Sequence, residues 1–302
     1  MSVIPDAHYS AVRAQVAGVP AGVVSLGATD TSEGESRVKS VEPKVFLVAR
    51  PELDYDEVAR YLRDVGGESW LERLDRGDLD DELNDPQNLA EFAGRLCYRS
   101  WEPGLNPNVV KIRTDSGQYL ENILRSLHGS VLEHVSFSFV LHNVSRVLTH
   151  ELVRHRPGVA ISQESMRFVR LQDIPFWFPD WAREDAELMK RATAMLEQME
   201  EFQAWMAGHF GLDDEGVPFK EKKHKTSFMR RFAPEGVGTG LVWTANVRTL
   251  RHTLENRTAP GAEEEIRLLF GKIGEVVRKE APDLFGDYVV EDGTWVPKWR
   301  KV

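Results

Sequence analysis

A group of polar side chains that could bind a ligand follows a helix-like run over residues 144–153. It begins with Arg154-His155-Arg156 and continues, after Pro157-Gly158, as Ile161-Ser162-Gln163-Glu164-Ser165-Met166-Arg167-Phe168. A basic helix end can simply face solvent, where cations gain a few tenths of a kcal/mol from the helix dipole. The interleaved serines, Gln and Glu favour another interpretation, because Arg offers a planar fork of donors for phosphate, carboxylate or a heterocycle edge. We predict a loop that holds an anionic, hydrogen-bond-rich ligand such as a nucleotide.

Two further groups of polar residues lie downstream. Arg230-Arg231 precedes Pro234 and is either a surface pair or a second anion clamp. Asn246 and Arg257 are eleven residues apart, about three helical turns, so on one helix they project from the same side. Such a pair can bind a carbonyl edge and stabilise negative charge that develops on it. The alternative is an exposed helix face with scattered polar residues.

The sequence gives little indication of a metal site or of a nucleophilic cysteine. His150-Glu151-Leu152-Val153-Arg154-His155 resembles a zinc-protease motif, but its two histidines are five residues apart, about 140° around a helix. They cannot share a face. His128, His134 and His142 follow no common ligand spacing either, so we predict no metal site. Cys97 has no adjacent base and lies on an apolar helix face, which predicts an inert core thiol.

The amino-acid composition limits the kinds of binding partner that this protein can have. The formal net charge of −10 argues against non-specific nucleic-acid binding, which depends on Lys and Arg neutralising phosphates. A basic pocket can still exist on an acidic protein. One cysteine allows no intrachain disulfide, no apolar run reaches the ~18 residues of a membrane span, and no signal pattern begins the chain. We therefore expect a cytoplasmic protein with no nucleic-acid or membrane partner.

Periodicity predicts the elements that must position these residues. Helical spacing of apolar residues extends over 54–65, 88–98, 117–127, 184–210, 247–255 and 263–279, and Ser145 can cap the helix that leads to the Arg-His-Arg triplet. Strand patterns extend over 44–49, 135–141, 166–171 and 238–243. The Met-containing stripe of 184–210 is a core or subunit-packing face.

The chain divides into one domain with two extensions. Residues 1–43 have the composition of a loosely ordered arm, 44–286 form the domain, and 287–302 are a tail that packs on the domain or reaches a partner chain.

In their order along the chain, these groups resemble the flavin-dependent thymidylate synthases. The signature of that family is Arg-His-Arg, a seven-residue spacer, Ser, and then Arg with an aromatic residue. Here eight residues separate Arg156 from Ser165, and Arg167-Phe168 follow. The resemblance also includes residues 93–100, 128–134, Arg230 and 246–257, roughly the central two-thirds of the chain.

The resemblance implies an α+β fold with helices packed around a curved, mainly antiparallel sheet. It implies FAD-dependent reductive C5 methylation of a uridine monophosphate, dUMP to dTMP, with methylenetetrahydrofolate as carbon donor and NADPH as reductant. Family members assemble as homotetramers whose active sites are shared between chains. The alternatives are the same chemistry on UMP, as in nucleoside-antibiotic pathways, and a flavin- and nucleotide-binding protein without methylation activity.

Site residues are carried over position by position. The resemblance implies cofactor contacts for His128, Ser130, Arg154, His155, Arg156, Gln163, Asn246 and Arg248. It implies nucleotide contacts for Glu151, Ser165, Met166, Arg167, Arg230 and Arg257. Of these, Arg257 and Ser165 are the predicted catalytic residues, and Arg257 would stabilise charge on the uracil as C5 becomes nucleophilic. Glu151 stands where the family usually has Gln, Gln163 where Glu is common, and Met166 where Gly or Gln is common.

Overall fold

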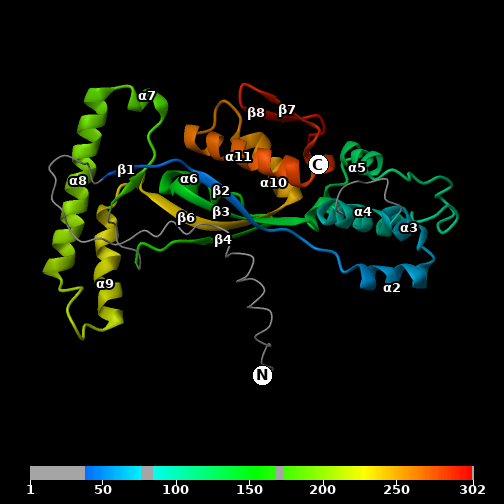
Figure 1. Cartoon of the computed structure of the whole chain (residues 1–302), viewed down its shortest axis with the longest axis horizontal. Coiled ribbons are helices and arrows are strands. Elements are labelled where there is room, and N and C mark those ends of the chain that lie inside the picture. Colours follow the sequence, from blue (N-terminus) through cyan, green and yellow to red (C-terminus); the bar gives the residue numbers. More distant parts are fainter. Residues whose placement is uncertain (1–37, 76–83, 168–172, 301–302) are drawn as a thin grey trace, which may run out of the picture. The chain divides into compact units, whose positions relative to one another are not determined.

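A four-stranded antiparallel sheet is the centre of the computed structural model, which describes residues 38–75, 84–167 and 173–300. The strand order is β2–β3–β6–β4, so that β6 pairs with β3 on one side and β4 on the other (Figure 1). The strands are β2 (Lys44–Ala49), β3 (Ser136–Ser145), β4 (Val159–Gln163) and β6 (Gly238–Asn246). This structure confirms the predicted fold class, an α+β fold with a mainly antiparallel sheet.

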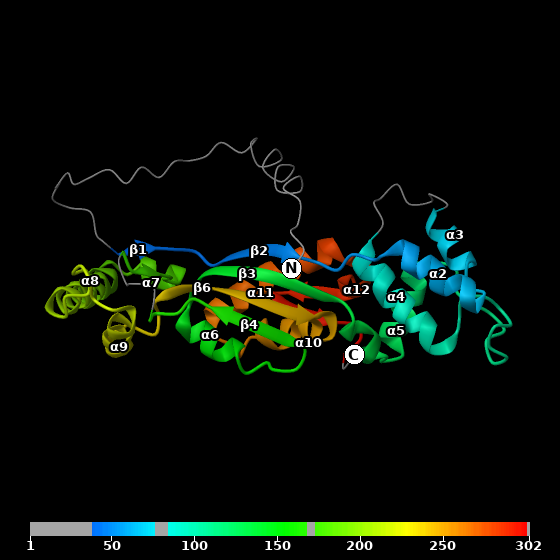
Figure 2. The ribbon, with the colours of Figure 1, turned by 90° about the horizontal axis from the view of Figure 1, so that it is seen from below.

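Alternation along β3 and β6 gives the sheet one buried face. Phe137, Phe139 and Leu141 are fully buried, whereas Ser138 and Val140 between them are only partly buried. Phe139 pairs with Trp243 of β6, and their rings stack with centroids 6.1 Å apart. Helices α10 (Val247–Arg257) and α11 (Glu264–Glu280) cover this face, and they lie behind the sheet in Figure 2.

The starts of α6 (Arg146–Leu152) and α10 are capped by the residues that end β3 and β6. Ser145 Oγ accepts from the N–H of Leu148 at 3.0 Å, which confirms the predicted cap. Ser145 donates in turn, through its N–H and hydroxyl, to the buried Glu265 carboxylate of α11. Burial raises the pKa of Glu265. Strands β3 and β6 therefore lead directly into α6 and α10, and the capping hydrogen bonds fix the direction in which each helix begins.

Two smaller helical groups flank the sheet. In the first, Trp70, Trp101 and Leu62 form a separate buried cluster, and a buried Arg95–Glu91 ion pair of 2.6 Å lies beside it. In the second, two long helices meet through Met206, Leu212 and Met229. The first group comprises α2 (Tyr55–Val65), α3 (Ser69–Asp75), α4 (Asp85–Tyr98) and α5 (Ser116–Arg125), and the second α8 (Ala186–His209) and α9 (Phe219–Met229).

Short elements complete the described chain. Strand β1 lies within the predicted arm and pairs in parallel with β5. The remaining elements are β1 (Lys39–Ser40), η1 (Gly129–Glu133), β5 (Pro175–Phe176), α7 (Asp180–Arg183), η2 (Arg230–Phe232), α12 (Pro282–Phe285), β7 (Tyr288–Glu291) and β8 (Thr294–Pro297). The boundaries proposed for the arm, the domain and the tail stay predictions.

The C-terminal tail packs on the domain, the first of the two predicted alternatives. Strands β7 and β8 form a hairpin whose turn, Asp292-Gly293, has positive φ at both residues. Trp295 is buried against α11, where a Cβ on Gly274 would lie 2.6 Å from the indole ring. Only glycine at that helical position lets the tryptophan approach this closely.

Several sequence predictions need correction. Cys97 is exposed rather than a core thiol, because it lies on the outer side of α4. On α8, Met195 is 60% exposed and Phe202 40%, so of the two alternatives predicted for the stripe a core face is excluded over most of its length, and a subunit-packing face stays a prediction. Met166 and Arg167 form a turn instead of a strand, and residues 168–171 of that prediction lie outside the described part, as do residues 76–83. Helix α3 was not predicted. No helix in the described part is long and apolar enough to cross a membrane.

The buried Arg251–Asp287 pair should carry much of the stability of the tail. Arg251 is 3% and Asp287 8% exposed, and Arg251 donates to both carboxylate oxygens, at 2.7 and 2.9 Å. Arg251→Ala leaves a buried unpaired carboxylate, so we expect a loss of about 3–5 kcal/mol in the free energy of unfolding, measured in urea. Arg60→Ala, which breaks an exposed pair with Glu57, should cost at most ~0.5 kcal/mol. Equal losses in the two variants would contradict this assignment.

Candidate functional site

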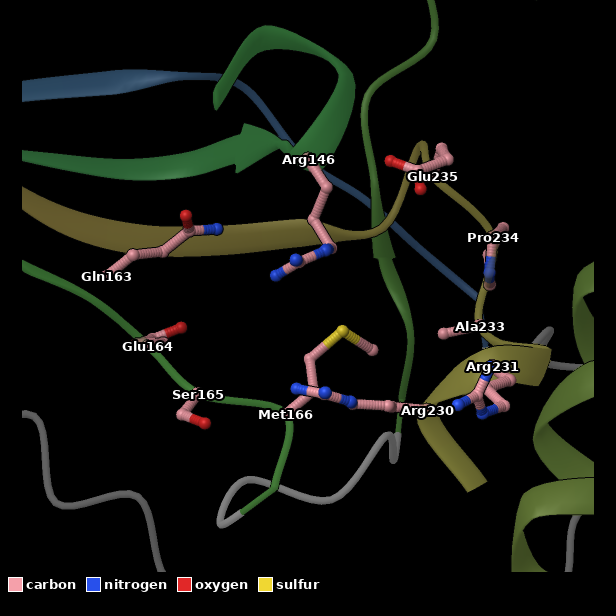
Figure 3. Close-up of a pocket in the computed structure, with 10 residues that line it drawn as sticks. All are labelled: Arg146, Gln163, Glu164, Ser165, Met166, Arg230, Arg231, Ala233, Pro234 and Glu235. Carbon is pink, nitrogen blue, oxygen red and sulfur yellow. The ribbon is translucent and has the colours of Figure 1, made fainter. Parts of the chain in front are cut away.

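Strand β4 connects two cavities. The first, which we call the triplet cavity, has a volume of about 540 Å³ and adjoins the Arg-His-Arg triplet at the start of β4. The second, which we call the Ser165 cavity, has a volume of about 440 Å³ and follows the end of β4 (Figure 3). The triplet cavity is lined by Glu133, Arg154, His155, Pro157, Gly158, Asn246, Arg248, Thr249 and His252. The Ser165 cavity is lined by Arg146, Gln163, Glu164, Ser165, Met166, Arg230, Arg231, Ala233, Pro234 and Glu235.

A glycine fixes the triplet against the start of α10. Gly158 has φ +68°, and a Cβ there would lie 2.4 Å from Asn246 Nδ2 and 2.6 Å from Thr249 Oγ1. The close approach lets the Asn246 N–H donate to the Gly158 carbonyl at 3.0 Å, while Thr249 Oγ1 donates to Pro157 at 2.7 Å. Asn246 is therefore the N-cap of α10 and not a residue within the helix, which corrects its predicted place.

Cations without acid partners surround this loop. Arg154 and Arg156 are exposed, and no described carboxylate pairs with either guanidinium. Arg248, by contrast, is held by Glu133 at 2.5 Å. Arg154 lines the triplet cavity with the buried Asn246 amide, whereas Arg156 does not line it; an unpaired guanidinium and an amide are donors suited to a diphosphate and a heterocycle. The donors at the triplet therefore fit a dinucleotide such as FAD.

Arg257, His155 and Glu151 form one hydrogen-bonded group behind the triplet. Arg257 donates from Nε to His155 Nε2 at 2.7 Å and from Nη1 to Glu151 Oε2 at 2.5 Å. Its Nη2 donates to the Glu151 carbonyl at 3.2 Å. A guanidinium has five N–H groups, so three are used and two have no partner among the described residues. Arg257 is thus oriented by the protein and still able to bind a carbonyl oxygen.

His155 must be neutral for this arrangement to hold. Burial, then the charge of Arg257 and then His252, lower the pKa of His155 from 6.5 to about 4. A neutral imidazole accepts at Nε2 and carries its proton on Nδ1, so it can receive the Arg257 N–H. At neutral pH the residue at the centre of the triplet is therefore an acceptor for Arg257 and adds no charge to the cavity.

The Ser165 cavity combines cations with carboxylates. Arg146 and Arg230 extend toward a common space beside Met166, whereas Arg231 turns away (Figure 3). None of these three arginines forms an ion pair with a described carboxylate. Ser165 Oγ accepts from the Arg167 N–H at 3.4 Å, which leaves its hydroxyl proton free to donate. The cavity can hold an anion, and donors from three separate segments surround it.

Eight of the fourteen predicted site residues line one of the two cavities, whereas Glu151, Arg156 and Arg257 line neither. Gln163, predicted as a cofactor contact, lines the Ser165 cavity instead. Arg167 lines neither cavity and donates from Nε to Ser227 Oγ at 3.0 Å. His128 stacks on Tyr98, with ring centroids 5.8 Å apart, and Ser130 is exposed on η1; neither lines a cavity. The functional roles of these residues stay predictions.

Arg146 and Glu164 were missed by the sequence analysis. Arg146 is the first residue of α6, where the positive pole of the helix dipole disfavours a cation. An arginine directly after a capping serine is thus a local conflict that could have marked it as a ligand-binding residue. Glu164 was named only as one member of the polar loop, and no local signal marks it as a cavity residue, because its position depends on the pairing of β4 with β6.

Comparison with known proteins identifies the family. The family described as thymidylate synthase complementing protein matches residues 78–283. The chain is 36% identical over 215 residues to the flavin-dependent thymidylate synthase of Mycobacterium tuberculosis, covering 69% of this chain and 83% of that protein. The chain belongs to the flavin-dependent thymidylate synthase family.

A second relative and a solved structure are also similar to this chain. The flavin-dependent thymidylate synthase of Mycobacteroides abscessus is 34% identical over 219 residues, again covering 69% of this chain and 83% of the relative. The crystal structure of thymidylate synthase X from Helicobacter pylori has a TM-score of 0.50 and 22% identity, covering 67% of this chain and 93% of that one. This last likeness supports the fold.

The His155 pKa can be tested directly. Between pH 4 and 6.5 the unfolded chain binds more protons at this residue than the folded one, so its contribution to stability is present above pH 6.5 and is lost as the pH falls through this window. An NMR titration of the His155 ring should show a midpoint near pH 4. In Arg257→Ala the midpoint should rise only part of the way toward 6.5, since burial is the larger cause. A midpoint near 6.5 in the unmodified protein would contradict the arrangement.

Proposed function

We propose that this protein is an FAD-dependent enzyme that reductively methylates C5 of dUMP, with methylenetetrahydrofolate as carbon donor and NADPH as reductant. The observation that carries the proposal is the pair of cavities that β4 connects, one at each end of the family signature. Membership of the flavin-dependent thymidylate synthases supports the reaction class.

The residues of the triplet cavity would hold FAD. Arg154 would meet its diphosphate from the cavity and Arg156 from beside it, and Asn246 and Arg248 would lie next to the flavin ring system. Bound reduced FAD would supply the electrons that turn the transferred carbon into a methyl group. The exposed cysteine needs no role in this chemistry.

Arg257 would act on the uracil. Its two remaining N–H groups would donate to a uracil carbonyl, where negative charge develops as C5 becomes nucleophilic. Glu151 and His155 fix the guanidinium, so little reorientation is needed when the nucleotide arrives. Arg146 and Arg230 would bind the nucleotide phosphate at the Ser165 cavity, with Ser165 donating from its hydroxyl.

A homotetramer is part of the same proposal. Met195, Phe202 and Trp205 are 40–60% exposed on α8, an apolar face that a second copy of the chain would cover. Arg231 lines both the Ser165 cavity and the groove beside this face, so the neighbouring copy would lie close to the nucleotide.

The reaction is tested by flavin binding and tritium release. Purified protein should show flavin absorbance, gain thermal stability with added FAD, and release tritium from C5-labelled dUMP when NADPH and methylenetetrahydrofolate are present. The same assay with labelled UMP tests the alternative substrate. Binding of FAD and nucleotide without tritium release would identify a binding protein that does not methylate, and absence of flavin binding would reject the proposal.

The two cavities should be separable by mutation. We expect Arg154→Ala to weaken FAD binding by about tenfold or more while the Kd for dUMP changes little, since it removes a cation from the triplet cavity alone. Arg230→Ala should do the reverse. Flavin fluorescence quenching and calorimetry with dUMP measure the two constants, and parallel losses in both variants would show that the cavities are not independent sites.

Arg257→Ala should separate cofactor binding from turnover. We expect the variant to keep bound FAD and to lose more than the tenfold in kcat that 1.4 kcal/mol represents, because charge on the uracil is then unstabilised. Arg300→Ala, which removes an exposed arginine outside both cavities, is the control and should keep kcat. Loss of flavin from Arg257→Ala before any loss of turnover would assign Arg257 to the cofactor instead.

A further inference from the structure

Glu164 lies directly beyond the end of β4, and β6 holds its side chain in place. Its N–H donates to the Gly240 carbonyl at 2.9 Å, which continues the strand pairing by one residue. Its carboxylate Oε2 accepts from the Gly240 N–H at 2.9 Å and from Thr239 Oγ1 at 3.4 Å. Oε2 of the carboxylate therefore has a structural role, since it attaches the side chain to β6.

The second oxygen, Oε1, has no donor among the described residues. Glu164 lines the Ser165 cavity together with Arg146 and Arg230, yet it forms no ion pair with either (Figure 3). Glu164 is exposed, so Oε1 is open to the cavity and to solvent, and a carboxylate oxygen on a side chain that the backbone already orients can accept a hydrogen bond from a bound ligand. The ligand must carry an anionic group for the arginines and, a short distance away, a hydrogen-bond donor for the carboxylate.

A nucleoside 5′-monophosphate has both groups. Its phosphate is joined through the 5′ carbon to a sugar whose free hydroxyls are donors. Carboxylates that accept from nucleotide sugar hydroxyls are a recurring means of recognition in proteins. Resting on the proposed function of this cavity, we propose that Glu164 Oε1 accepts a hydrogen bond from the sugar hydroxyl of the substrate, the 3′-hydroxyl in dUMP. Glu164 is then a specificity-determining residue that requires a free sugar hydroxyl.

A purely structural role for Glu164 makes a different prediction. If the carboxylate only fastens the end of β4 to Gly240, replacing it would change the affinity for every nucleotide by the same factor. A hydroxyl contact instead changes the affinity only for nucleotides that carry the hydroxyl. The ratio of two dissociation constants therefore distinguishes the two roles, whatever happens to the absolute affinity.

The experiment pairs Glu164→Gln with two nucleotides. The amide oxygen of Gln can still accept from the Gly240 N–H, while the free oxygen becomes an NH₂ group that no longer accepts. Calorimetry on the FAD-loaded protein gives the Kd for dUMP and for 2′,3′-dideoxyuridine monophosphate. We expect the unmodified protein to bind dUMP about tenfold or more tightly than the dideoxy nucleotide, and Glu164→Gln to reduce this ratio to about twofold.

Glu235→Gln is the matched control. Glu235 lines the same cavity from another segment, with its carboxylate 4.0 Å from His150, so its removal alters the charge of the cavity but not the proposed contact. Both affinities should shift together and the ratio should stay as in the unmodified protein. If Glu164→Gln fails to fold, as judged by its melting curve, Glu164→Asp replaces it, because the shorter side chain cannot reach Gly240 and the hydroxyl together.

The outcomes separate the two proposals. An unchanged ratio in the Glu164 variant, or no preference for dUMP over the dideoxy nucleotide in the unmodified protein, overturns the role of Glu164 and leaves the proposed reaction standing. Failure of the unmodified protein to bind dUMP and UMP at all rejects both. Tighter binding of UMP than of dUMP that disappears in Glu164→Gln supports the contact and assigns it to the 2′-hydroxyl.

Discussion

The pairing of β6 with β3 and β4 is the constraint on which the rest of the site depends. Gly158, just before β4, contacts Asn246 at the end of β6, and Glu164, just after β4, contacts Gly240 near its beginning. Antiparallel pairing thus fixes both ends of β4 at once. One strand register therefore determines the distance and orientation between the two cavities, and the fully buried Trp243 in the middle of β6 makes a slip of this register costly.

Ion pairing separates the buried structural arginines from the arginines that line the two cavities. Arg95 and Arg251 are buried, and acidic side chains hold each of them. The arginines of the two cavities have no acid partner among the described residues, with Arg248 and Glu133 as the exception. On a protein with a formal charge of −10, leaving a guanidinium unpaired concentrates positive potential where an anion can use it. Arg257 shares features of both groups. Glu151 orients its guanidinium, as in the structural arginines, and two of its N–H groups have no partner among the described residues.

Errors in the sequence analysis have identifiable physical causes. Cys97 was assigned to the core because apolar side chains at helical spacing usually face it, but which side of a helix is covered depends on its neighbours. Residues 166–167 form a turn although they begin a predicted strand, and next to the start of β6 it is Phe176 of β5 that pairs, with Val237. Asn246 ends a strand and caps a helix, a role that spacing along one helix could not reveal.

The sequence by itself determined the family, and through that resemblance the fold class, because the signature is a local pattern whose residues are close in the chain. Periodicity predicted three of the four strands of the central sheet and most of the longer helices, but not β4 or α9. Arg154, His155 and Ser165 could be proposed as site residues because they belong to this local signature. Only the tertiary structure decided that Arg257 donates hydrogen bonds to Glu151 and His155 and that Arg146 lines the same cavity as Arg230. The same holds for Glu164, of which one carboxylate oxygen accepts from the backbone and the other has no donor among the described residues. Those contacts join residues that are distant in the chain, so they depend on strand register and helix packing, which no local pattern encodes.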